Sequence, residues 1–94
     1  MALSPDRIDA ILTLADARFA AGDRLDEVVK ALRAANPDLK TVTGTQAAVM
    51  AEDPFREAAR FDLHLVDGNN HCWLITDRPD AATGIVIAER DDES

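Results

Sequence analysis

Apolar side chains recur at helical spacing in the first part of the chain. Ser4 is a typical N-cap, Pro5 suits the first helical position, and Gly22 can adopt the left-handed conformation that ends a helix. The spacing therefore predicts a helix over residues 5–21. The apolar face of this helix consists of Ile8, Ile11, Leu12, Ala15 and Phe19.

A second amphipathic pattern follows at once. Asp23, with Asp26 three positions later, is a variant of the capping box, and Asn36-Pro37 stops the pattern. A helical hairpin over about residues 5–35 cannot bury both apolar stripes by itself, so the rest of the chain must supply a third surface. The second stripe consists of Leu25, Val28, Val29 and Leu32.

The middle of the chain has weaker patterns. Residues 39–43 predict a short strand because they contain β-branched side chains. We expect the segment 44–60 to be irregular, with a helical turn or two over 54–60, where Pro54 separates this piece from the small residues before it. Because surface segments without regular structure often carry contacts, this segment is one candidate for partner binding.

The last third of the chain is typical of strands. Residues 61–66 alternate between apolar and polar, residues 67–70 (Asp-Gly-Asn-Asn) predict a turn, and residues 71–76 resume the extended pattern, which together indicate a β-hairpin. Residues 84–89 predict a last strand. Two helices laid on a small antiparallel sheet of three or four strands make an α+β two-layer sandwich.

Composition narrows the class of protein. Ninety-four residues, 47% hydrophobic and 30% charged, favour one ordinary globular domain over 1–94, with a radius of gyration of about 12 Å. The net charge of -8 makes nucleic acid and anionic membranes poor partners. We expect residues 90–94 to form a frayed acidic tail. A single cysteine, and a start without the pattern of a secretion signal, predict a cytoplasmic protein without internal disulfides.

Part of the chain resembles a known family. Residues 65–68 (Leu-Val-Asp-Gly), His71-Cys72 and residues 82–89 (Ala-Thr-Gly-Ile-Val-Ile-Ala-Glu) are similar to the C-terminal signature of small proteobacterial proteins of uncharacterised function. The resemblance covers roughly the last third of the chain and brings no catalytic residues with it. Such proteins are associated with nitrogen-fixation gene neighbourhoods, so the resemblance implies an accessory role around nitrogenase.

Two histidines flank the predicted turn and raise the question of a metal site. Symmetric closure of the hairpin places His64 and His71 on one sheet face about 7 Å apart, with Asp62 as a third ligand. In this register Val66 faces His71, and His64 faces Trp73. A loop one residue longer, with a bulge, separates the two histidines instead, so the site exists in only one of two registers. Isolated histidines near a turn more often hydrogen-bond the turn, and zinc sites usually have a full set of closely spaced ligands.

Other chemistry has less support in the sequence. Cys72 is a candidate redox thiol, although a cysteine in mid-strand usually packs as a small apolar residue, and His71 beside it points to the opposite face. Trp73 is better suited to core packing than to anchoring an interface. Because no nucleophile has an obvious base, we expect neither catalysis nor a cofactor.

These observations predict a small acidic accessory or regulatory protein that binds a larger protein partner, toward whose basic patch the net charge would steer it. A nitrogenase component or nitrogenase assembly factor is the partner that the resemblance implies. The alternative is a metal- or redox-sensing module using His64, His71 and Cys72. Self-association through an exposed edge strand at 85–88 is a third hypothesis. The residues expected to contact the partner are Leu65, Asp67, Asn69, His71, Trp73, Phe55 and Arg56.

Overall fold

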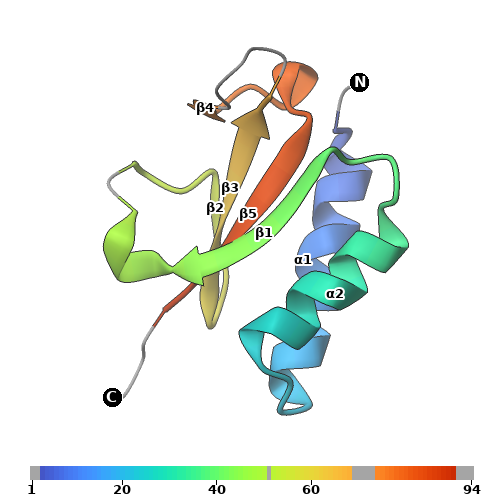
Figure 1. Ribbon diagram of the computed structural model, residues 1–94, viewed down its shortest axis with the longest axis vertical. Coiled ribbons are helices and arrows are strands. Elements are labelled where there is room, and N and C mark those ends of the chain that lie inside the picture. The colour runs from blue at the N-terminus through green and yellow to red at the C-terminus, as the bar shows by residue number, and fades with distance from the viewer. Residues whose placement is uncertain (1–2, 51, 69–73, 91–94) are drawn as a thin grey trace.

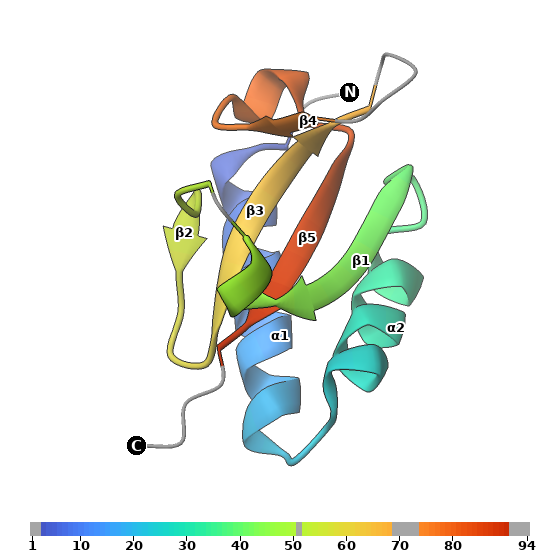
Figure 2. The same ribbon diagram turned by 60° about the vertical axis from the view of Figure 1, so that its left-hand side comes forward.

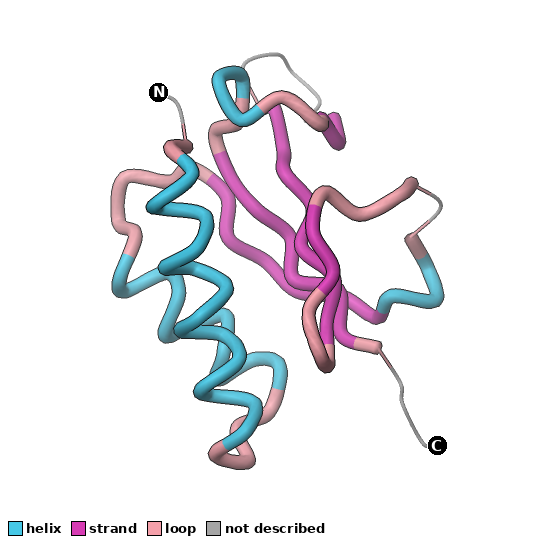
Figure 3. The backbone as a smooth tube through the Cα atoms, turned by 180° about the vertical axis from the view of Figure 1, so that it is seen from behind, coloured by secondary structure: helices cyan, strands magenta, loops and turns pink. Residues whose placement is uncertain are grey.

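Two helices cover one face of a five-stranded sheet in the computed structural model, which describes residues 3–50, 52–68 and 74–90 (Figure 1). Seen from behind, both helices lie on the same side of the sheet (Figure 3). The α+β class is confirmed, and the radius of gyration is 12.3 Å. The sheet, however, is mixed rather than purely antiparallel, and it has five strands rather than three or four.

The first helix, α1 (Pro5–Ala20), begins and ends close to the predicted positions. The Ser4 side chain accepts a hydrogen bond from the backbone N–H of Arg7 (3.2 Å), as an N-cap should. Gly22 has a φ of +97° and donates its N–H to the Phe19 carbonyl (3.0 Å). The left-handed glycine thus closes the helix by backbone hydrogen bonds.

The N-cap of the second helix, α2 (Leu25–Ala35), lies one residue after the predicted cap. Arg24 occupies the N-cap position, and its backbone N–H donates to the Glu27 carboxylate (2.8 Å). The predicted cap at Asp23 is therefore wrong, and this residue forms an ion pair with Arg18 instead (2.6 Å). The shift places the longer glutamate side chain where it can reach back to the first N–H groups.

The strand order in the sheet is β1-β5-β3-β2, and β4 pairs with the end of β3 beyond β2. β5 runs parallel to β1, whereas all the other pairs are antiparallel. Because β5 has a neighbour on each side, the hypothesis that residues 85–88 form a free edge for self-association is wrong. The strands are β1 (Thr41–Gln46), β2 (Arg56–Glu57), β3 (Phe61–Asp67), β4 (Leu74–Thr76) and β5 (Gly84–Glu89).

Regular structure forms in parts of the segment 44–60 where it pairs with other strands. It completes β1, makes a 3-10 turn, η1 (Ala47–Val49), and then forms β2 where a helical turn was predicted. The edge of β3 explains the difference, because Phe55 and Ala58 donate backbone hydrogen bonds to β3 (both 2.9 Å). Pairing with an available strand edge outweighs a weak local helix propensity. A second 3-10 turn, η2 (Pro79–Ala81), precedes β5.

The main core lies between the helices and the sheet. The rings of Phe19 on α1 and Phe61 on β3 meet with their centroids 5.5 Å apart. Both predicted helical stripes contribute to this core, so the sheet is the third surface that the helices required. Its largest fully buried side chains include Ile8, Ile11, Leu32, Phe61, Leu63, Leu65, Ile85 and Ile87.

Two glycines permit close approaches within this architecture. A Cβ at Gly44 in β1 would lie 2.9 Å from side-chain atoms of Leu25 and Val29, so α2 sits directly against the strand. A Cβ at Gly84 in β5 would lie 2.3 Å from the Thr41 carbonyl oxygen. Both distances exclude a side chain without movement of the neighbours, so these positions set the spacing of α2, β1 and β5.

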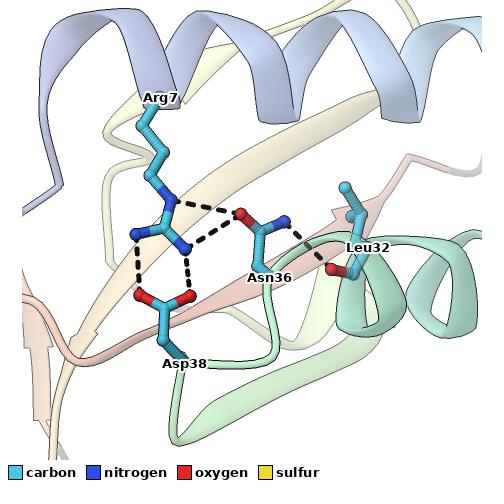
Figure 4. Close-up of polar contacts among 4 residues, drawn as sticks. All are labelled: Arg7, Leu32, Asn36 and Asp38. Atoms are coloured by element: carbon cyan, nitrogen blue, oxygen red, sulfur yellow. Dashed lines mark hydrogen bonds and ion pairs between the residues drawn. The ribbon is translucent and has the colours of Figure 1, made fainter.

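A polar network joins the start of α1 to the end of α2 (Figure 4). The Arg7 guanidinium binds both carboxylate oxygens of Asp38 and also donates to the Asn36 side-chain oxygen (3.1 and 3.2 Å). Asn36, which is buried, donates in turn to the Leu32 carbonyl (2.9 Å) and so satisfies a carbonyl in the last turn of α2. The hydrogen bond from Arg7 is the main reason that the pKa of Asp38 lies below its usual value.

Candidate functional site

The sheet face away from the helices is also buried. It carries alternate residues of β3 and β5, namely His64, Val66, Val86 and Ala88, none of which is more than 2% exposed. In Figures 1 and 2, η1 lies on this side of the sheet, opposite the helices. A second, smaller buried layer therefore backs the sheet.

His64 is the polar member of this layer. It pairs with Val86 of β5 and is 1% exposed. Its Nδ1 atom has no hydrogen-bond partner among the described residues. Burial lowers the pKa of His64 below its ordinary value, although the nearby carboxylates of Asp62 and Glu52 act in the opposite direction. Burial thus favours the neutral form of the imidazole.

The described residues do not assemble the metal site that the sequence suggested. Asp62 lies two residues from His64 on the same strand face, as predicted, but its carboxylate is ion-paired with Arg90. Arg90 also donates to the Ala58 carbonyl. Within residues 3–50, 52–68 and 74–90 no group of three metal-ligating side chains comes together, and His71 lies outside these residues.

The register of the β3–β4 hairpin differs from both predicted registers. Val66 lies opposite Ile75, not His71, and Asp67 lies opposite Leu74. Six residues, 68–73, therefore separate the paired positions Asp67 and Leu74 along the chain. His64 pairs with Val86 of β5, and Trp73, which was predicted to face it across the hairpin, lies outside the described residues. The Asp-Gly-Asn-Asn sequence favoured a short turn, but pairing of the following residues with β3 decided the register.

The residues predicted to contact a partner differ in how far the structure exposes them. Leu65 is fully buried beneath the helices, so its assignment to a partner surface is wrong. Phe55 is half-buried against the core, and the exposed Arg56 places its guanidinium 5.3 Å from the Phe55 ring centroid. Asp67 is half-buried at the end of β3. Asn69, His71, Cys72 and Trp73 lie outside the described residues.

A cleft of about 490 Å³ lies between the segment before β2 and the strand β4. Its lining includes the apolar residues Phe55 and Ile75 and three acidic residues, Glu52, Asp53 and Asp77. Leu74, next to Ile75 in β4, is 60% exposed. We call this site the acidic cleft, and its lining residues are Glu52, Asp53, Pro54, Phe55, Ile75, Thr76 and Asp77.

Sequence reasoning missed most of the acidic cleft. Phe55 was predicted as a contact residue, but the three carboxylates and Ile75 were not. Glu52 and Asp53 are separated from Asp77 by more than 20 positions, so only the pairing of β2 and β4 with the same edge of β3 brings them together. The excess of acidic residues after position 46 was the one sequence feature that pointed to this region.

Neither helix in the described part of the chain is long and apolar enough to span a membrane. In comparisons with protein-family models, curated proteins and solved structures, the chain matches none.

Proposed function

We propose that this protein is a small accessory or regulatory protein that binds a larger protein partner through the acidic cleft, rather than catalysing a reaction. The observation that supports this proposal is the combination of apolar surface with unpaired carboxylates in one concave site. Among the described residues, none of the carboxylates of Glu52, Asp53 and Asp77 takes part in an ion pair. Each therefore keeps its charge available for a ligand.

The chemistry of the cleft favours a basic segment of a protein as its ligand. Carboxylates around a recess attract Lys or Arg side chains and raise the association rate. Phe55 and Ile75 offer apolar contact to the stems of those side chains, and the exposed Leu74 extends the apolar area. The charge of residues 47–94, eleven acidic against four basic, adds a longer-range attraction.

The family resemblance suggests which partner to test first. A nitrogenase component or a nitrogenase assembly factor would place the protein in the cytoplasm of a nitrogen-fixing cell. A basic surface segment on such a partner is what the acidic cleft requires.

The test is affinity capture of the tagged protein from its own cells, at low and at high salt, followed by mass spectrometry. The variant removes three charges from the cleft by Glu52→Gln, Asp53→Asn and Asp77→Asn. The matched control removes three charges from α1 by Asp6→Asn, Asp9→Asn and Asp16→Asn.

We expect one partner to be captured in near-stoichiometric yield by the unmodified protein and by the control. The cleft variant should lose most of this partner, and high salt should have the same effect, because exposed charge interactions are screened. Equal capture by the cleft variant and the control would contradict the proposal, and so would a failure of the unmodified protein to retain any partner.

A further inference from the structure

A second surface of opposite charge lies at the other edge of the sheet. β1 pairs with β5 on one side, and no described strand lies on its other side. Beside this edge is a groove of about 310 Å³ between the strand and the flank of α2. We call it the α2–β1 groove. Its walls are formed by Leu25, Val29, Lys30 and Arg33 of α2, with Asp26, and by Thr43 and Gly44 of β1.

The groove depends on the absence of a side chain at Gly44. Without a Cβ at this position, the apolar side chains of Leu25 and Val29 come directly against the strand backbone. Arg33 reaches from α2 to donate a hydrogen bond to the Val42 carbonyl (2.7 Å). The Val42 carbonyl of β1 therefore accepts its hydrogen bond from an arginine side chain rather than from a neighbouring strand.

The edge of β1 lacks the usual protection against added strands. Its sequence, Thr-Val-Thr-Gly-Thr-Gln, contains no charged residue and no proline, and three of its six residues are β-branched threonines. Natural edge strands are commonly blocked by lysine, proline or a bulge. The Arg33 side chain occupies the Val42 carbonyl at this edge. A ligand strand can replace this hydrogen bond, because the guanidinium can turn to bind a carboxylate of the ligand instead.

The charge around the groove is opposite to that of the rest of the chain. Residues 24–46 contain four basic and three acidic residues, a net charge of +1 within a chain of net charge -8. In the described part of the structure, Arg7, Arg18, Arg78 and Arg90 are each ion-paired with a carboxylate. Lys30 and Arg33 take part in none of those ion pairs. With the single carboxylate of Asp26, the two cations give the groove lining a net charge of +1.

We infer that the α2–β1 groove binds an extended acidic segment of a partner protein, which adds as a strand beside β1. Main-chain hydrogen bonds to β1 would give the affinity, apolar side chains would contact Leu25 and Val29, and carboxylates would meet Lys30 and Arg33. A second copy of this chain fits less well, because two-fold pairing of β1 with itself would bring the same cations together. The inference concerns a different surface from the acidic cleft and does not depend on the proposed function.

The test begins with selection from a library of random ten-residue peptides displayed on phage, using the full chain as bait. We expect the recovered peptides to carry acidic residues that alternate with β-branched or other apolar residues. Their affinity should fall about tenfold or more in Lys30→Glu, because an attraction becomes a repulsion. Lys30 is exposed, so this change should leave the fold intact. The matched control is Arg78→Glu, which makes the same charge change at an exposed site on the residue before η2.

Two further readouts identify the binding mode. Amide chemical-shift changes on addition of the best peptide should concentrate in residues 41–46 and on α2. N-methylation of the peptide at alternate positions should abolish binding for one set of positions and leave the other set nearly unchanged, because only every second amide of an added strand faces β1.

Several outcomes would overturn the inference. These are recovery of no peptide, recovery of basic peptides whose shift changes map to the acidic cleft, and equal affinities for Lys30→Glu and Arg78→Glu. Shift changes in residues 41–46 that grow with protein concentration in the absence of peptide would show that a second copy occupies the edge instead. The test of the groove changes Lys30 and Arg78, whereas the test of the acidic cleft changes Glu52, Asp53 and Asp77. A negative result for one surface therefore leaves the proposal for the other surface standing.

Discussion

The two faces of the central strands are both buried, but they are built differently. Toward the helices, β3 and β5 present large apolar side chains, which join the stripes of two capped helices. On the other face they present His64, Val66, Val86 and Ala88 beneath a segment with little regular structure. Complete burial therefore does not mean that both faces carry side chains of the same size and polarity. The helix side carries most of the large buried apolar side chains, whereas the second face includes the polar His64, whose Nδ1 has no hydrogen-bond partner among the described residues.

The largest effect is expected from a cavity on the helix side. Leu63→Ala should lower the free energy of unfolding by about 2–5 kcal/mol, because Leu63 is fully buried and two helices cannot collapse into the space. Urea unfolding followed by circular dichroism measures this change. A loss below about 1 kcal/mol would show that the helix layer is not the tighter of the two.

A smaller effect is expected from the matching truncation on the second face. Val86→Ala removes two methyl groups from a side chain that is 2% exposed, which corresponds to about 1.5 kcal/mol at roughly 0.8 kcal/mol for each buried carbon. The segment that packs over Val86 can move into the space left by the truncation more easily than a helix can. If urea unfolding of Val86→Ala shows a loss equal to that of Leu63→Ala, the two faces are packed alike.

His64 makes the second face sensitive to acid. Because its pKa in the folded state lies below the ordinary value of 6.5, the unfolded chain binds a proton more readily than the folded protein does. The contribution of His64 to the free energy of unfolding should therefore be constant above about pH 7 and decrease as the pH falls through 6.5 toward the lowered pKa.

His64→Leu tests this dependence, because leucine has a similar volume and no polar atom. We expect thermal unfolding at neutral pH to change little and the decrease between pH 7 and 5 to become smaller. Asp62, with its partner Arg90, and Glu52 are the charged groups that face the same region, and His64→Leu leaves them in place. An unchanged pH profile in His64→Leu would contradict the assignment of the acid sensitivity to His64.

The smallest effect is expected from the network that joins the helices. The lowered pKa of Asp38 stabilises the folded state above the ordinary value of 3.8, and this contribution is lost as the pH falls through the lowered pKa. Arg7→Gln should therefore lower the melting temperature slightly at pH 7 and have less effect near pH 2. The effect should be small because both side chains of the ion pair are partly exposed. A loss of stability larger than that of Val86→Ala would contradict this expectation.

Local features determined the elements whose ends and faces are set by neighbouring residues. The cap at Ser4, the left-handed Gly22 and the stripes at helical spacing were sufficient for both helices, apart from one residue at the start of α2. The strand at 84–89 was also predicted with its observed ends, because a short apolar run with β-branched residues leaves few alternatives. The α+β class followed from these elements.

Tertiary structure decided what depends on pairing between distant residues. The parallel alignment of β1 with β5, the strand at β2, the hairpin register and the burial of Leu65 each require a partner more than a few positions away. The same holds for both proposed surfaces, since the acidic cleft joins residues 52–55 to 75–77 and the groove joins α2 to β1. Local propensities differ by at most about 1 kcal/mol per residue, so hydrogen bonding to an open strand edge and burial against it determine the outcome.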